Sequence, residues 1–207
     1  RDEQKMEELK QQNMQVQMDY LKYQINPHFF MNTLNNIHAL IDIDTQWAKN
    51  AVIELSKMMR YVLYDSERET ISLTRDIQFL KNYIELMRIR YTDAVDIRIE
   101  HPSTLPARIT IPPLLLIVFV ENAFKHGVGA NKASFIHIRI DCNEDKVTAV
   151  IANSRFKIAH PKHSDGIGLK NVRKRMELIY GPKNYELRIE ETADTYTVNL
   201  EIPTLHA

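Results

Sequence analysis

Residues 24–35 read QINPHFFMNTLN and stand inside a long repeat of mainly apolar residues. The repeat positions alternate between intervals of three and four residues, which is the heptad period of a coiled coil or helical bundle. They are Met6, Leu9, Asn13, Val16, Tyr20, Tyr23, Pro27, Phe30, Leu34, Ile37 and Ile41. Proline removes one backbone hydrogen bond, so we expect a local kink in this helix at Pro27.

A second amphipathic helix is predicted after a turn at residues 42–46. Its apolar residues have helical spacing and are Ala48, Val52, Leu55, Met59 and Val62. Two helices joined by a short turn form an antiparallel hairpin, and two hairpins form a four-helix bundle. A further helix is expected at about residues 74–90.

After Tyr91 the apolar residues alternate with polar ones, as they do in strands. Strands are expected around residues 95–99, 136–140, 147–151, 187–189 and 196–202, and helices at about 112–126 and 168–180. The fold class is therefore α+β, with a helical hairpin that forms a dimeric four-helix bundle, followed by an α/β sandwich. Although the period changes near residue 92, helix 74–90 can pack on the sandwich, so the domains are set at 1–70 and 71–207.

Composition excludes several classes of protein. The 207 residues carry a formal net charge of zero, which argues against nucleic acid or an anionic membrane surface as the main partner. A single cysteine, Cys142, excludes a disulfide framework and a multi-cysteine metal site. No apolar run reaches the roughly 18–20 residues of a membrane span. Because the first residue is Arg1, we expect a piece of a longer protein, and a membrane segment could precede it.

His28 stands one step off the heptad seam, at an outward position. Gln24, His28, Asn32 and Asn35 then form one polar stripe along the helix. An exposed neutral imidazole is a nucleophile near neutral pH, and an amide one turn away can orient the ring or a water molecule. The alternative is a surface histidine beside a helix kink.

The end of the helix at 112–126 carries a second group of polar residues. Asn122 offers an amide oxygen suited to Mg²⁺ on nucleotide phosphates, and Lys125 offers positive charge. Glu121 could orient a water molecule or a metal-bound ligand. Alternatively, Lys125 and His126 only favour the negative end of the helix dipole before the stop at Gly127.

Two weaker motifs complete the candidates. Gly166 and Gly168 precede a helix, where exposed backbone N–H groups can approach phosphate oxygens, although an ordinary helix-entry turn has the same pattern. Asn153 ends a predicted strand and could read an adenine amino group or form an Asx turn.

The order of these motifs resembles the two-component sensor histidine kinases of the LytS/YehU type. The specific segments are QINPHFFMNTLN at 24–35, IPPLLLIVFVENAFKHG at 111–127 and GIGLKNVRKRMELIYG at 166–181. The resemblance covers residues from about 15 to 202. It implies a dimerisation and phosphotransfer bundle followed by an ATP-binding domain of the Bergerat type.

The resemblance also implies residue roles. His28 is the phosphoacceptor, with Asn32, Gln24 and Glu121 in the catalytic set, and Asn122 binds Mg²⁺. The residues implied to bind ATP are Asn122, Lys125, His126, Asn153, Gly166, Gly168, Leu169, Asn171 and Arg173.

The implied partners are a second copy of the chain and a response regulator, whose aspartate receives the phosphate and which often carries a LytTR-type DNA-binding domain. No direct contact with nucleic acid is implied. The parent protein is expected to be anchored in the bacterial inner membrane, with this part on the cytoplasmic face.

Three positions depart from the wider kinase pattern. Phe29 stands where an acidic residue usually follows the phosphorylated histidine, and Asn153 stands where aspartate usually contacts adenine. Residues 154–156, Ser-Arg-Phe, replace the glycines expected there. These departures motivate an alternative, a degenerate kinase that acts as a dimeric signalling scaffold without ATP turnover. A third reading is an ATPase of the same superfamily that is not a kinase, although a histidine box on a heptad helix argues against it.

Overall fold

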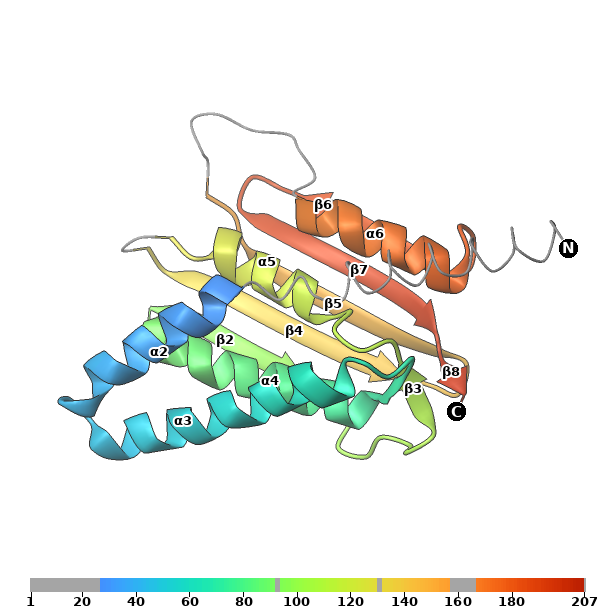
Figure 1. The fold of residues 1–207 in the computed structure, drawn as a ribbon. Coiled ribbons are helices and arrows are strands. Elements are labelled where there is room, and N and C mark those ends of the chain that lie inside the picture. The colour runs from blue at the N-terminus through green and yellow to red at the C-terminus, as the bar shows by residue number, and fades with distance from the viewer. Residues whose placement is uncertain (1–26, 92–93, 130–131, 157–166, 207) are drawn as a thin grey trace, which may run out of the picture.

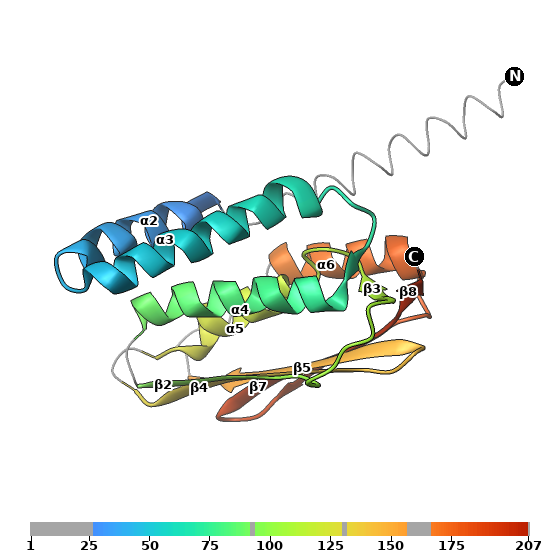
Figure 2. The same ribbon diagram turned by 90° about the horizontal axis from the view of Figure 1, so that it is seen from below.

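The computed structural model describes residues 27–91, 94–129, 132–156 and 167–206. Seen edge-on in Figure 2, the described part has three layers. A helical hairpin forms the first layer, a set of helices forms the middle one, and a sheet forms the last. The α+β class predicted from the sequence is confirmed.

The hairpin consists of helix α2 (Pro27–Ile41) and helix α3 (Thr45–Arg60), which run side by side in Figure 1. Asp44 caps α3, because its side chain accepts a hydrogen bond from the backbone N–H of Trp47 at 2.9 Å. A five-residue π-helix, η1 (Tyr61–Asp65), continues α3. The heptad positions before Pro27, and with them the expected kink, lie outside the described residues.

One flank of each hairpin helix is buried within the chain. The buried residues are Thr33, Ile37 and Leu40 on α2, and Ala48, Ala51, Leu55 and Met58 on α3. Several residues of the apolar repeats are about half exposed within one chain: Leu34 50%, Ile41 47%, Val52 48% and Met59 46%. Their burial in a bundle of two hairpins stays a prediction. Both helices have apolar residues on two neighbouring flanks, and packing inside one chain uses only one of them.

Helix α4 (Leu73–Arg90) confirms the helix expected at 74–90. Ser72 caps it, and most of its length is buried, because it lies between the hairpin and the rest of the molecule (Figure 2). Its buried residues are Leu73, Asp76, Ile77, Phe79, Leu80, Asn82, Tyr83, Ile84, Leu86 and Met87. None of the helices in the described ranges is long and apolar enough to span a membrane.

The main sheet has five strands in the order β2-β4-β5-β7-β6, and all five were predicted. They are β2 (Val95–Glu100), β4 (Ser134–Cys142), β5 (Lys146–Ser154), β7 (Thr195–Pro203) and β6 (Glu186–Glu191). β2 pairs with β4 in parallel, and the other pairs are antiparallel. Helices α4, α5 (Ile117–Gly127) and α6 (Ile167–Tyr180) cover one face of this sheet (Figure 2).

The sequence missed a second, small sheet of short strands. β3 (Ile109–Ile111) pairs with both β1 (Ile71–Ser72) and β8 (Leu205–His206). The chain segment that leads into α4 is thereby tied to the end of the chain.

Helix α5 begins five residues later than predicted from the sequence. The residue before a proline is disfavoured in the helical region, so the pair Pro112-Pro113 keeps Ile111 and Pro112 extended. Leu114 then has a φ of +59°, and the helix starts only at Ile117. The expected helix start at about residue 112 was therefore wrong.

A buried polar cluster joins the hairpin to the sandwich. The Tyr61 hydroxyl donates to Asp76 Oδ1 at 2.6 Å, and the Arg175 guanidinium donates to the carbonyl oxygen of Pro113 at 2.6 Å. Burial raises the pKa of Asp76 to about 6, although the hydrogen bond from Tyr61 opposes this shift. Asp76 is thus a carboxyl group that the folded chain holds partly protonated near neutral pH.

This shift makes a testable contribution to stability. Since the pKa of Asp76 is higher in the folded chain than in the unfolded one, its stabilising effect is present at low pH and is lost as the pH rises through about 6. Between roughly pH 4.5 and pH 6.5, the unfolding free energy of the wild-type chain should fall by about 2 kcal/mol because of Asp76. We expect Asp76→Asn to abolish this fall. Denaturant unfolding of wild type and variant across this range measures it, with Asp42→Asn in the exposed turn as control. Parallel pH curves for wild type and Asp76→Asn would contradict the assignment.

Candidate phosphoacceptor and nucleotide site

His28 lies in the first turn of α2 with its side chain exposed to solvent. Asn32 lies one turn later, and its Nδ2 is 2.9 Å from His28 Nδ1. The contact between these two members of the polar stripe is therefore present, and it gives the ring a fixed orientation. Gln24, the third predicted member near the ring, lies outside the described residues.

The amide of Asn32 can meet either tautomer of the His28 ring. With Nδ2 facing the ring, Nδ1 accepts and Nε2 carries the proton. If the amide turns by 180°, Oδ1 accepts from Nδ1–H, and Nε2 presents its lone pair to solvent. Asparagine can thus orient the ring and select its tautomer as a carboxylate would, although it cannot take a proton from it.

Phe29 turns toward the interior of the molecule. Its ring centroid is 4.9 Å from that of Tyr83 on α4, and the Tyr83 ring lies 5.7 Å from that of Phe124 on α5, edge to face. Burial, followed by the nearby negative charge of Glu121, raises the pKa of Tyr83 well above its usual value. An aromatic chain therefore connects the turn that carries His28 to helix α5. Neither Tyr83 nor Phe124 is expected at the site from the sequence, because a single aromatic residue on a helix carries no signal of its partner.

The polar residues at the end of α5 differ in their exposure to solvent. Asn122 and Glu121 are half-buried, whereas Lys125 and His126 are exposed. Burial raises the pKa of Glu121 to about 7, against the opposing charge of Lys125. Burial also lowers the pKa of His126, with a further contribution from Lys125. Glu121 can therefore exchange a proton near neutral pH, as a general base or acid must.

Asn153 lies at the end of β5 with only 2% of its surface exposed. Its Nδ2 donates to the carbonyl oxygen of Ser154 at 2.7 Å, so the amide oxygen is the atom left to accept a further hydrogen bond. The side chain fits against the last residue of α5, since a Cβ on Gly127 would lie 2.6 Å from Asn153 Cβ. Gly127 thus makes room for Asn153 and does more than stop the helix.

The start of α6 lies against the middle of α5. A Cβ on Gly168 would meet Val118 at 3.6 Å, while Gly168 itself is exposed and leaves its backbone open to a ligand. Asn171 and Arg173 are half-buried on the same helix. Leu169 is 5% exposed and its side chain belongs to the core, so only its backbone could face a nucleotide. Gly166 lies outside the described residues.

The side chains that could ligate a metal ion are few. Within the described ranges, no group of three or more histidine, cysteine, aspartate or glutamate side chains could hold a metal ion. A lone amide such as Asn122 suits Mg²⁺ that keeps most of its ligands from water and phosphates.

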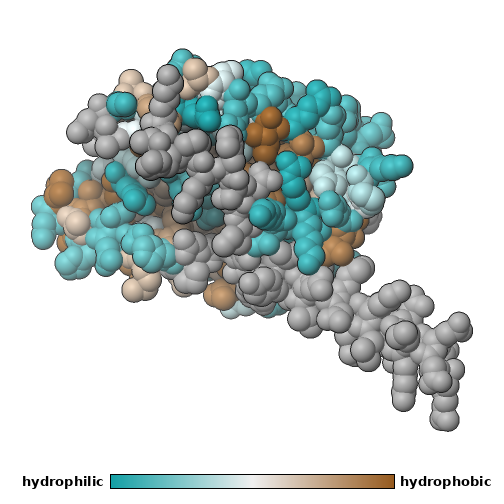
Figure 3. Space-filling model, turned by 90° about the horizontal axis from the view of Figure 1, so that it is seen from above, coloured by the Kyte–Doolittle hydropathy of each residue, from teal (hydrophilic) through white to brown (hydrophobic). Residues whose placement is uncertain are grey.

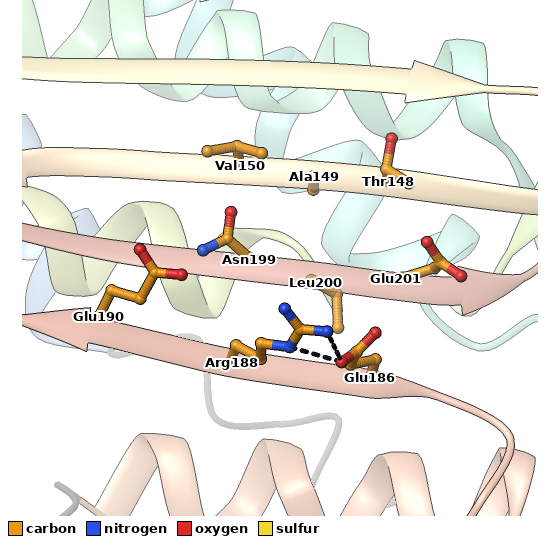
Figure 4. A pocket seen from close by; sticks show the side chains of 9 residues that line it. All are labelled: Thr148, Ala149, Val150, Glu186, Arg188, Glu190, Asn199, Leu200 and Glu201. Carbon is orange, nitrogen blue, oxygen red and sulfur yellow. Dashed lines mark hydrogen bonds and ion pairs between the residues drawn. The ribbon is translucent and has the colours of Figure 1, made fainter.

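A surface hollow lies elsewhere. About 330 Å³ in volume, it is on the sheet face away from the helices and is lined by polar side chains of β5, β6 and β7, among them Asn199 and Glu201 (Figure 4). Figure 3 shows a mainly hydrophilic surface on which hydrophobic side chains appear in separate places. Because the hollow is on the sheet face away from the helices, it is separate from the candidate residues on α5 and α6.

Comparisons with known proteins agree with this arrangement. The histidine kinase family model matches residues 16–95. The sensor protein LytS of Streptococcus mutans is 31% identical over 197 aligned residues, which cover 88% of this chain and 33% of that protein. LytS of Staphylococcus haemolyticus is 29% identical over 197 residues, covering 89% of this chain and 33% of that protein.

The chain is a relative of the sensor histidine kinases. The resemblance to the LytS group is thereby confirmed, and the chain spans about a third of the length of the LytS proteins it matches. The histidine kinase domain of the blue-light activated kinase EL346 from Erythrobacter litoralis has the same fold, with a TM-score of 0.51 at 14% identity over 93% of each chain.

The close fit between Gly127 and Asn153 gives a prediction for this kinase relative. Gly127→Ala must displace the Asn153 amide, since the new Cβ would lie 2.7 Å from Asn153 Nδ2. We expect Mg-ATP affinity to fall about tenfold, the equivalent of one hydrogen bond. Titration with a fluorescent ATP analogue measures it. Gly181→Asn at the end of α6, where φ is +80° and asparagine is tolerated, is the control. Unchanged affinity in Gly127→Ala would show that Asn153 does not contact the nucleotide.

Proposed function

We propose that this chain is the phosphotransfer and ATP-binding part of a sensor histidine kinase, which transfers the γ-phosphoryl group of ATP to His28. The observation that carries the proposal is the exposed His28 ring held by Asn32 at 2.9 Å, on the same chain as the polar residues of α5, β5 and α6. Residues 1–70 would form the dimerisation and phosphotransfer part, and residues 71–207 the ATP-binding part.

The nucleotide would lie between α5 and α6, with its adenine at the end of β5. The Asn153 amide oxygen would accept a hydrogen bond from the adenine amino group, because its Nδ2 is already bound to Ser154. Exposed backbone at Gly168 and the positive charges of Lys125 and Arg173 would bind phosphate oxygens. Asn122 would hold Mg²⁺, which neutralises charge on the phosphates when it is bound.

In the transfer step, Nε2 of His28 would attack the γ-phosphorus. The Nε2–P bond forms, the bond from phosphorus to the bridging oxygen breaks, and ADP leaves with those electrons. The ring, positively charged after the attack, then releases its Nδ1 proton to solvent. Asn32 Oδ1 would hold the proton on Nδ1, which keeps the Nε2 lone pair available. Because phosphoryl transfer is catalysed mainly by positioning and charge neutralisation, a neutral amide is sufficient for this task.

The proposed assembly is a homodimer of the hairpins. The exposed flank with Leu34 and Ile41 on α2 and Val52 and Met59 on α3 would form the four-helix interface with a second copy. The phosphate would then pass to an aspartate of a response regulator, which in the group this chain resembles often carries a LytTR-type DNA-binding domain. The parent protein would be membrane-anchored, with this part at the cytoplasmic face and with no direct nucleic-acid contact.

One observation favours the scaffold alternative. The residues that replace the expected glycines are engaged within the chain, since Arg155 pairs with Glu191 at 2.9 Å and a Cβ on Gly129 would lie 2.8 Å from the Phe156 ring. Such contacts reduce the space and freedom that glycines would give a nucleotide. A chain without detectable Mg-ATP binding at millimolar nucleotide would be a scaffold.

Incubation with Mg²⁺ and γ-labelled ATP tests the proposal. We expect acid-labile label on the wild-type chain and none on His28→Gln, because only an imidazole nitrogen there can form the phosphoramidate. His38→Gln, an exposed histidine on the same helix, is the matched control and should label normally. Label that persists in His28→Gln would exclude His28 as the acceptor.

The role of Asn32 predicts opposite effects of two substitutions. Asn32→Ala should slow autophosphorylation about tenfold, the rate equivalent of one hydrogen bond to the ring. Asn32→Asp offers only acceptor atoms, fixes the proton on Nδ1 and should retain the wild-type rate or exceed it. Asn50→Ala on α3 removes an exposed amide that also has a partner one turn away, Gln46, and serves as control. Equal losses in both Asn32 variants would argue against tautomer control.

A further inference from the structure

Phe29 connects the phosphoacceptor turn to the ATP-binding half of its own chain. Its ring packs on Tyr83 at 4.9 Å, and Tyr83 packs on Phe124 at 5.7 Å, both distances between ring centroids. Phe124 lies two residues beyond Asn122 on α5. Two ring contacts therefore separate the neighbour of His28 from the helix that would hold the nucleotide metal.

The position of His28 around α2 agrees with this connection. At about 100° per residue, Phe29 and Asn32 lie on one flank of α2 with His28 beside them, and Leu34 and Ile41 lie on the opposite flank. Phe29 on the first flank meets Tyr83 on α4 of the same chain, whereas Leu34 and Ile41 are about half exposed. The flank left for a second copy is thus not the one that carries His28.

The connection is supported along the hairpin. Tyr61 stacks on Phe79 of α4 with centroids 4.2 Å apart, and its hydroxyl donates to buried Asp76. The hairpin is therefore seated on α4 at both ends, at Phe29 and at Tyr61. The ATP-binding half of another chain could pack on this hairpin in the same place only if the contacts of both Phe29 and Tyr61 with α4 were broken.

We propose that Phe29 is a positioning residue that seats the phosphoacceptor turn on its own ATP-binding half, so that His28 takes its phosphate from ATP bound by the same chain. The inference rests on the proposed kinase function. The phosphoryl step is the one given above, with the Nε2–P bond formed and ADP released within one chain. Phe29, which stands where an acidic residue usually follows the phosphorylated histidine, thus has a positioning role instead of an acid–base role.

Heterodimers of differently tagged full chains test transfer within one chain. Pairing His28→Gln with Asn122→Ala leaves no chain with both an acceptor and a metal-binding amide, so we expect no label from γ-labelled ATP. Pairing wild type with the double variant His28→Gln/Asn122→Ala leaves one complete chain, and we expect label on the wild-type chain. Transfer between chains predicts the reverse in both pairs.

Label on the Asn122→Ala chain of the first pair, or none on the wild-type chain of the second, overturns the inference. A wild-type homodimer without any acid-labile label overturns the kinase proposal itself, which is a different result. The two failures are therefore distinguishable.

The role of Phe29 has its own readout. Phe29→Ala should lower the initial rate of autophosphorylation about tenfold or more while the Kd for Mg-ATP stays within about twofold, because the nucleotide residues are untouched. Phe29→Tyr retains the ring and should restore the rate. Phe135→Ala removes an aromatic ring that packs on His137 in the sheet and is the control. A Phe29→Ala chain that labels at the wild-type rate, or one that loses rate and nucleotide affinity together, contradicts a positioning role.

Discussion

The burial of α4 on two sides is the constraint on which the rest of the structure depends. One side of this helix receives the hairpin through Phe79 and Tyr83, and the other side packs toward α5 and the small sheet at β1 and β3. A helix that is apolar on more than one flank cannot remain at a surface, so each neighbour needs the other to cover it. The hairpin and the α/β sandwich are consequently parts of one packed body in this chain, and the place of His28 follows from that packing.

Two kinds of contact secure this junction and have different chemical consequences. The aromatic contacts of Phe29, Tyr83 and Phe124 involve no group that titrates near neutral pH, since burial raises the pKa of Tyr83 well above its usual value. The buried pair of Tyr61 and Asp76 includes a group whose pKa is raised to about 6, so its strength changes near neutral pH. Position at the phosphoacceptor end is thus set by apolar packing, whereas the far end of the hairpin is held by a polar contact.

The sequence predicts the strands well because alternation along β4, β5 and β7 reflects a sheet with one buried face. It predicts the contact of Asn32 with His28 for a similar reason, since both lie on one helix and their spacing is fixed. Contacts between distant segments have no such signal. From the sequence alone, Phe29 therefore indicates only the absence of the usual acidic residue, and Asp76 looks like an ordinary charged residue of a helix. The late start of α5 is also not predictable from the sequence, because the left-handed backbone conformation of Leu114 depends on tertiary packing.

The central claim is that the histidine seated at this junction is the phosphate acceptor. The most direct test is tandem mass spectrometry of the wild-type chain after incubation with Mg-ATP, at alkaline pH where phosphohistidine survives. The chain has eight histidines. The account predicts that phosphate is found on the peptide containing His28. Phosphate on a peptide with any other histidine, or on none, would contradict it.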